Sequence, residues 1–226
     1  LKLQTSMGIA HVNLFGHGKE IIVMSHGWAD SSKSFNQLVL SLTQHGYMVA
    51  AIDHIGHGKS TGKKSHLLSF IETMELLIEH FNEERINVKA IIGHSMGSIA
   101  TLNLPDYLLK NKKIILVSSP IKLFELMFEK VEQVGISRKL LKRVLESIST
   151  KYGRNWRHLS LENQREKLNL DITFIHDRND KFAPFADIEA FLKEEKTPLI
   201  TTSGLGHIRI LGDTSVIDNI TQVIVA

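Results

Sequence analysis

A serine stands at the centre of the pentapeptide Gly93-His94-Ser95-Met96-Gly97. The apolar run 90–92 before it is typical of a strand, and residues 98–104 after it are predicted to form a helix. A sharp turn from strand to helix exposes the side chain at its tip, and small flanking residues let the two elements approach each other. The N-terminus of the helix also directs N–H groups toward developing negative charge. The pattern predicts Ser95 to be a nucleophile. The same five residues could also form an ordinary glycine-rich turn between a strand and a helix.

A histidine that could activate this hydroxyl follows much later in the chain. His207 ends the glycine-rich run 204–207, after a strand predicted at 198–202. A serine hydroxyl is a poor nucleophile until an adjacent imidazole accepts its proton. Loops at the carboxyl ends of parallel strands are where such sheets build their sites. Position therefore favours His207 as the base over the other histidines, although any single one of them could be a solvated loop residue.

Two carboxylates could orient that imidazole. Asp177 and Asp180 both follow a strand predicted at 171–175, and a carboxylate there would hold the imidazole tautomer and stabilise the imidazolium. Each also has an ordinary structural explanation, Asp177 as a turn residue and Asp180 as a helix cap. Both choices give the order serine, aspartate, histidine along the chain, which is the order expected for a triad on this kind of sheet.

Main-chain donors for a negatively charged oxygen are predicted at two turns. His26-Gly27-Trp28 follows a strand predicted at 20–25, so the N–H of Trp28 can lie opposite that of Met96. Two such N–H groups would form an oxyanion hole, in which the loss of one donor costs about 2.7–4 kcal/mol. The Trp28 side chain could at the same time simply cover the core.

Short apolar runs alternate with helical patterns along the whole chain. Strands are predicted at 9–14, 20–25, 47–53, 88–92, 114–118, 171–175 and 198–202. Apolar residues recur at helical spacing over 70–81 and 188–192, and a last helix is predicted over 216–225. The alternation predicts an α/β fold with a mostly parallel sheet.

Residues 121–168 interrupt this alternation with helical patterns and no strand. We expect one domain over 1–226, with this segment inserted as a helical cap. The segment carries 11 Lys or Arg against 6 Asp or Glu, which indicates either a solvated helical surface or a preference for anionic substrates or surfaces. Phe124, Met127 and Phe128 could line a pocket for an apolar ligand, or serve as ordinary packing within the cap.

These segments together resemble the α/β-hydrolase superfamily, in particular small serine hydrolases with a helical cap. The resemblance runs from about Ile9 to the end of the chain. It is carried by His26-Gly27-Trp28, the run 53–60, the run 93–97, the run 180–184 and Gly206-His207. The family places its acid four residues before a proline that begins a helix, so the resemblance selects Asp180, four residues before Pro184.

The resemblance further implies Ser95 as nucleophile, His207 as base, and Trp28 and Met96 as oxyanion donors, with no metal or organic cofactor. Three features depart from the family pattern. Ser98 stands where many members have a glycine, Pro105 predicts a short or kinked helix, and little sequence precedes Ile9, so a first edge strand is expected to be missing or minimal.

The function expected from the resemblance is hydrolysis of a carboxylic ester, or a related acyl bond, of a small molecule through an acyl-enzyme. The alternative is a ligand-binding or sensing protein with slow or no turnover on the same scaffold, because a fold does not establish a function. All three residue types of a triad favour catalysis, since a binding protein needs none of them.

Composition excludes several other classes. The chain has 226 residues, of which 42% are hydrophobic and 23% charged, values typical of a globular protein. The absence of cysteine excludes disulfides, thiolate metal sites and cysteine nucleophiles. A net charge of +3 is too small to indicate nucleic acid as the main partner. No signal peptide and no apolar run long enough to span a bilayer are visible, so a cytoplasmic location is expected.

Two further motifs resemble those of other chemistries. Gly58-Lys59-Ser60 ends like a phosphate-binding loop, but the position that needs glycine is Asp53, whose carboxylate would oppose a phosphate. His54 and His57 are three residues apart, yet the chain has no His-Glu-x-x-His pair. The run 53–60 is therefore predicted to be a structural turn beside the site, and no metal is expected.

Overall fold

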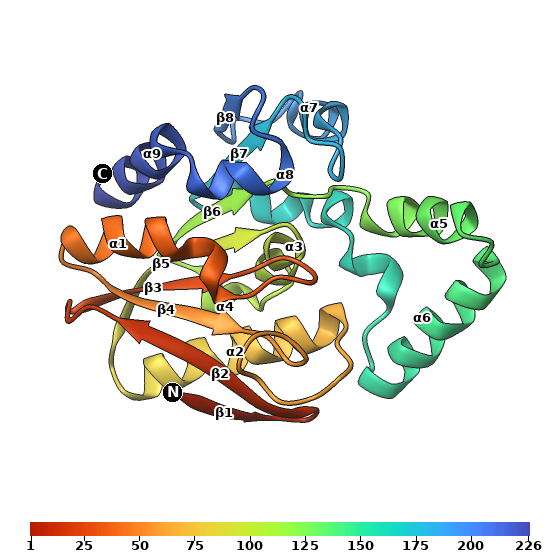
Figure 1. Ribbon diagram of the computed structural model, residues 1–226, viewed down its shortest axis with the longest axis horizontal. Coiled ribbons are helices and arrows are strands. Elements are labelled where there is room, and N and C mark those ends of the chain that lie inside the picture. Colours follow the sequence, from red (N-terminus) through yellow and green to blue (C-terminus); the bar gives the residue numbers. More distant parts are fainter.

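Eight strands form one sheet with the order β1-β2-β4-β3-β5-β6-β7-β8 in the computed structural model, which describes residues 1–226 (Figure 1). The strands are β1 (Lys2–Thr5), β2 (Gly8–Phe15), β3 (Glu20–Ser25), β4 (Met48–Asp53), β5 (Asn87–His94), β6 (Lys113–Val117), β7 (Ile172–Asp177) and β8 (Leu199–Thr202). β2 pairs antiparallel with both β1 and β4. The remaining pairs, β4–β3, β3–β5, β5–β6, β6–β7 and β7–β8, are parallel. The mostly parallel α/β sheet predicted from the sequence is confirmed.

The central strands are apolar in their middle residues, where both faces of the sheet are covered. Successive residues of β3 alternate between two cores: Ile21 and Val23 face one, and Ile22 and Met24 face the other. All four are fully buried. Continuous apolar runs of this kind are the sequence signature of parallel strands, and the seven predicted strands lie within two residues of their observed bounds. The four-residue β1 is the additional, minimal edge strand.

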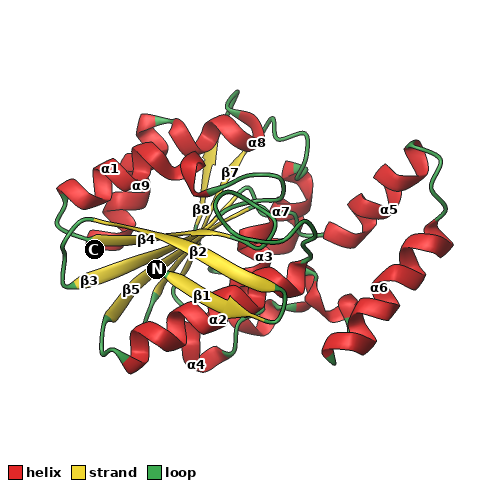
Figure 2. Ribbon diagram, turned by 60° about the horizontal axis from the view of Figure 1, so that its bottom comes forward, coloured by secondary structure: helices red, strands yellow, loops and turns green.

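Helices pack on both faces of the sheet (Figure 2). α1 (Asn36–Gln44) and α9 (Thr214–Val225) cover one face, and α2 (Leu67–Glu83), α3 (Met96–Leu102), α4 (Asp106–Leu109) and α7 (Phe185–Leu192) cover the other. α3 ends before Pro105, which precedes α4 directly, as the early proline predicted. α1 was not predicted from the sequence; its first turn has no side-chain cap, and it continues from a short 3-10 turn, η1 (Ser32–Phe35).

The segment between β6 and β7 contains helices and 3-10 turns but no strand. It contains α5 (Leu123–Gln133) and α6 (Arg138–Tyr152), followed by the 3-10 turns η2 (Trp156–Leu159), η3 (Leu161–Asn163) and η4 (Arg165–Asn169). Both views show the α5–α6 hairpin projecting away from the sheet (Figures 1 and 2). Part of the positive charge of residues 121–168 is neutralised by ion pairs, which are Arg138–Glu132, Arg154–Glu75 and Arg157–Glu146.

None of the helices combines the length and the apolar character that crossing a bilayer requires.

Candidate active site

Ser95 lies at the tip of the turn between β5 and α3. Its backbone has φ 53° and ψ −115°, a conformation that L-residues rarely adopt and that persists only where the surrounding structure enforces it. The two flanking glycines are sterically required. A Cβ on Gly93 would lie 2.7 Å from the carbonyl oxygen of Gly97, and a Cβ on Gly97 would lie 2.2 Å from that of Ser25. The tight turn leaves the Ser95 side chain partly exposed above the sheet.

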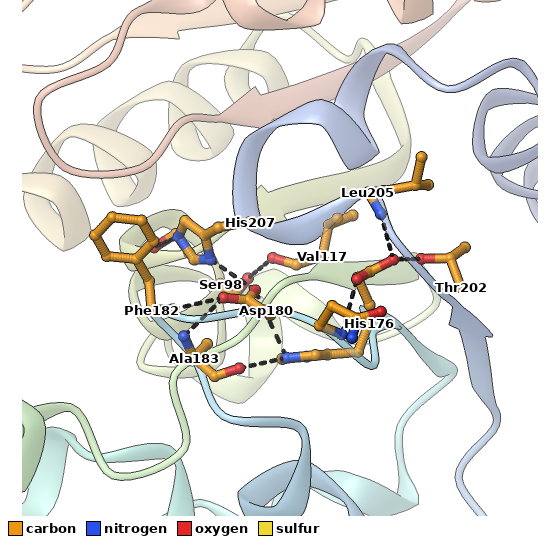
Figure 3. A network of polar contacts seen from close by, with 12 residues as sticks. Ser98, Val117, His176, Asp180, Phe182, Ala183, Thr202, Leu205 and His207 are labelled. Atoms are coloured by element: carbon orange, nitrogen blue, oxygen red, sulfur yellow. Dashed lines mark hydrogen bonds and ion pairs between the residues drawn. The ribbon is translucent and has the colours of Figure 1, made fainter.

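His207 lies in the one-turn helix α8 (Gly206–Arg209), directly after the loop that follows β8. Its Nε2 is 2.9 Å from Ser95 Oγ, and its Nδ1 is 2.7 Å from Asp180 Oδ2. The other oxygen of Asp180 accepts hydrogen bonds from the backbone N–H groups of Phe182 (2.8 Å) and Ala183 (2.9 Å). Figure 3 shows the Asp180 carboxylate between His207 and these two residues. The structure therefore brings all three side chains into one hydrogen-bonded chain.

The charge on Asp180 fixes the direction of these hydrogen bonds. Burial opposes ionisation of this carboxyl group, but the hydrogen bond from His207 and the N–H groups of Ala183 and Phe182 outweigh it, so the pKa is lowered. An ionised Asp180 can only accept a hydrogen bond, and it therefore takes the proton on Nδ1 of His207. Nε2 is then left to accept the hydrogen bond that Ser95 Oγ donates.

Asp177, the other candidate acid, does not contact His207. Its carboxylate accepts hydrogen bonds from Thr202 Oγ1 (2.7 Å), Leu205 N–H (3.0 Å) and Asn179 N–H (2.9 Å). Burial alone would raise its pKa, but these and further backbone hydrogen bonds lower the pKa to about 2. Asp177 thus ties the end of β7 to the loop that carries His207, and the position next to the imidazole belongs to Asp180.

The two residues expected to donate to an oxyanion belong to segments next to Ser95. Gly27 lies against Ser95, since a Cβ on it would be 3.0 Å from that of Ser95. The next residue, Trp28, has an N–H with no hydrogen-bond acceptor in the structure. Met96 is the first residue of α3, so its N–H is one of the helix donors that lack an intrahelical partner.

Two buried side chains beside the turn between β5 and α3 make hydrogen bonds that were not predicted from the sequence. His94 Nε2 lies 2.8 Å from the carbonyl oxygen of His207, and burial lowers the pKa of His94 to about 4, so the neutral ring donates this hydrogen bond. Ser98, which stands where many relatives have a glycine, donates its hydroxyl to the Gly93 carbonyl oxygen at 2.8 Å. Neither hydrogen bond has a local sequence signature.

The run 53–60 forms a structural turn. The Asp53 carboxylate accepts hydrogen bonds from the N–H groups of Ser32 and Lys59, both at 2.9 Å. The Lys59 N–H that a phosphate-binding loop would offer to a ligand is therefore occupied by the protein itself. His54 Nε2 is 2.8 Å from Ser25 Oγ, and His57 bonds to backbone groups on both sides of its ring.

Large apolar side chains are exposed near the three hydrogen-bonded residues. Trp28, Phe182 and Ile208 are 52%, 54% and 62% exposed, respectively, and the Phe182 ring centroid lies 5.3 Å from that of His207. Phe124 and Phe128, expected either to line a pocket or to pack within the insertion, both contact the Trp156 ring, at 4.9 and 5.8 Å. These contacts match the second expectation, packing within the insertion. Phe182 and Ile208 have no sequence signal beyond their proximity to Asp180 and His207.

The sheet order, the strained turn at Ser95 and the position of His207 define an α/β-hydrolase fold, which confirms the resemblance read from the motifs. Residues 16–190 match the family described as serine aminopeptidase, S33, and the chain belongs to this family.

Curated relatives resemble parts of the chain. A monoacylglycerol lipase of Mycolicibacterium smegmatis is 32% identical over 34% of this chain and 29% of its own length. A monoglyceride lipase of Rattus norvegicus is 30% identical over 38% of this chain and 30% of its own length. The matches thus span less than a third of either relative.

Solved structures resemble the whole chain in fold. An esterase of Pyrococcus furiosus superposes with a TM-score of 0.73 at 18% identity, over 99% of this chain and 88% of its own. An esterase of Exiguobacterium antarcticum superposes with a TM-score of 0.66 at 17% identity, over 100% of this chain and 99% of its own.

Proposed function

We propose that the protein is a serine hydrolase that cleaves carboxylic esters of small molecules through an acyl-enzyme. The observation that carries this proposal is the chain of hydrogen bonds from Ser95 Oγ through His207 to Asp180, at 2.9 and 2.7 Å. A nucleophile in contact with a base, and a base in contact with an ionised orienting group, is the arrangement that activates a hydroxyl.

In the proposed reaction, Ser95 Oγ attacks the ester carbonyl while His207 Nε2 accepts its proton. Asp180 stabilises the imidazolium, and the N–H groups of Trp28 and Met96 bind the oxyanion of the tetrahedral intermediate. The imidazolium then protonates the departing alcohol and leaves an acyl-serine. Water, deprotonated by His207, attacks the acyl carbon, and collapse of the second intermediate releases the acid and regenerates Ser95.

The choice of esters is supported by the printed names of similar proteins, which include monoacylglycerol lipases and esterases. The site adds a physical reason, since the exposed Phe182 ring next to His207, the exposed Ile208 that follows it and the exposed Trp28 ring offer apolar surface to an acyl or alkyl group. Burial of such groups contributes about 25 cal/mol per Å² of apolar surface.

We further propose that the chain is one domain and that residues 121–168 act as a cap beside the substrate entrance. The contact that supports this role is the Lys130 ammonium of α5, which lies 4.4 Å from the Phe182 ring centroid. Because Phe182 packs next to His207, the α5–α6 hairpin reaches the rim of the site.

Labelling with a fluorophosphonate, followed by mapping of the modified peptide, tests the function and the nucleophile together. We expect the probe to modify Ser95, and p-nitrophenyl esters of short acids to be hydrolysed. Ser95→Ala should remain folded and lose hydrolysis by at least about 10³-fold. Ser147→Ala, at an exposed serine of α6, is the matched control and should behave like the wild type. A ligand-binding protein without turnover would show neither labelling nor hydrolysis.

A further inference from the structure

Two histidine side chains hydrogen-bond the peptide units on either side of the Trp28 Cα. His26 Nδ1 lies 2.6 Å from the carbonyl oxygen of Gly27, and the N–H of Ala29 lies 3.2 Å from Nε2 of His57. The loop between β3 and η1 is therefore fastened immediately before and immediately after the proposed oxyanion donor.

The hydrogen bond to Gly27 determines where the Trp28 N–H points. The Gly27 carbonyl and the Trp28 N–H belong to the same peptide unit, which is planar and trans, so the two groups point in opposite directions. A donor that holds the carbonyl on one side thus directs the N–H to the other side. That N–H has no acceptor in the protein, which leaves it available for a developing oxyanion.

The hydrogen-bond partners of each ring fix its tautomer. The N–H of His54 donates to His26 Nε2 at 3.1 Å, so the proton of His26 must lie on Nδ1, and burial lowers its pKa to about 4. His57 Nδ1 lies 3.0 Å from the carbonyl oxygen of Ile55, so it donates there and leaves Nε2 to accept from Ala29. The hydrogen-bonding roles of both rings are fixed by the backbone around them.

The loop needs this support because it is strained. Ala29 has φ 57°, in the left-handed region that non-glycine residues avoid, and such residues persist only where their surroundings enforce the conformation. The supports are themselves anchored in the core. Phe70 of α2 is fully buried, stacks on His54 with 3.7 Å between centroids, and contacts His26 and His57 at 5.5 and 5.6 Å.

We propose that His26 and His57 are positioning residues that hold the Trp28 N–H toward the oxyanion of the tetrahedral intermediate. The inference rests on the proposed function, because it assigns these residues to that reaction. It also gives a purpose to the turn 53–58, which supplies the His54 N–H and the His57 ring. The two histidines touch the donor's peptide units and act on the reacting atoms only through them.

Paired variants separate positioning from general stability. His57→Leu and His26→Ala remove the hydrogen bonds. His57→Gln keeps an acceptor for the Ala29 N–H, and His26→Asn keeps a donor near the Gly27 carbonyl. For each we would measure kcat and KM for p-nitrophenyl butyrate, the inhibition constant of an alkyl trifluoromethyl ketone, and the melting temperature. The ketone reports on the oxyanion hole directly, because its adduct with serine carries the oxyanion.

We expect the two deleting variants to lower kcat at least ~10-fold, short of the ~10²–10³-fold loss that follows removal of a donor. KM should change less than about threefold, and ketone binding should weaken in parallel with kcat/KM. The conservative variants should recover much of the loss. His45→Leu is the matched control, because His45 bonds a backbone carbonyl oxygen, that of Ser41 at 2.8 Å, but lies at the end of α1. It should leave kcat and ketone binding unchanged.

Three results would overturn the inference. Deleting variants that keep kcat and ketone binding within twofold of the wild type would refute positioning while the proposed function stands. A loss that follows the melting temperature and is not recovered by the conservative variants would show a purely structural role. Because His57 is only partly buried, His57→Leu keeps the test available if His26→Ala does not fold. A wild-type protein that neither turns over esters nor binds the ketone would refute the proposed function, and the inference with it.

Discussion

At the scale of single residues, two neighbouring aspartates divide two tasks. Asp180 accepts from the imidazole of His207, and Asp177 accepts from Thr202 and from the loop that leads to His207. Both have a lowered pKa, because in each case hydrogen bonds outweigh the cost of burial. The sequence left this pair open, since either residue could reach a loop after β8, and only the fold decides which carboxylate meets the ring.

Replacing each aspartate by asparagine should separate these tasks. Asp180→Asn removes the charge that stabilises the imidazolium and no longer fixes the tautomer, so kcat should fall by about 10³–10⁴-fold. Asp177→Asn should lower the melting temperature and reduce kcat by less than about tenfold, because it loosens the loop without touching the ring. Steady-state kinetics and thermal unfolding of both variants check this. A larger kcat loss in Asp177→Asn would move the orienting role to that residue.

At the scale of elements, the junction of β5 and α3 depends on close packing against β3. Gly97→Ala would place a Cβ 2.2 Å from the Ser25 carbonyl oxygen, so strand and helix must separate. We expect the free energy of unfolding to fall by about 1–3 kcal/mol or more, as measured by urea denaturation. Gly212→Ala is the control, since nothing lies within 4 Å of its added Cβ. Equal stability of the two variants would contradict this account of the junction.

The strands and the turn at Ser95 were predictable because their sequence patterns are local. Apolar runs such as 20–25 and the glycines around Ser95 carry their structural reason within a few residues. α1 was not predicted, although its buried Leu38, Val39 and Leu42 recur at helical spacing. The positions of His26 and His57 around Trp28 were not predictable, because their hydrogen bonds join segments about thirty residues apart in the chain. Contacts between such distant segments leave no pattern in the local sequence.

At the scale of the whole molecule, buried neutral histidines make the fold sensitive to acid. Burial lowers the pKa of both His26 and His94 to about 4, from 6.5, and lowers that of His54 and His176 as well. The unfolded chain takes up protons on these histidines below about pH 6.5, whereas in the folded protein His26 and His94 do so only near pH 4. Stability is therefore fully present above pH 6.5 and is lost progressively as the pH falls toward 4.

Between pH 7 and pH 5 we expect the free energy of unfolding to fall by on the order of 2 kcal/mol for each of His26 and His94. The lowered pKa of Asp53, Asp177 and Asp180 keeps these carboxylates ionised through this range, so their contribution is lost only at lower pH. Urea titrations at several pH values, combined with proton uptake on unfolding, measure the effect. A free energy that is constant from pH 7 to pH 5 would contradict it.

The shallow packing of the α5–α6 hairpin affects how often this part of the molecule opens. α6 is 15 residues long and buries only Leu145, while Leu140 and Val144 are exposed. Helices with so few buried contacts open without unfolding the sheet. In deuterated water, the amides of α6 should therefore exchange well before those of β3 and β5. Lys130 of the same hairpin lies over the Phe182 ring. Local opening of the hairpin would therefore change the width of the proposed substrate entrance, and a substrate held against Phe182 would slow the exchange.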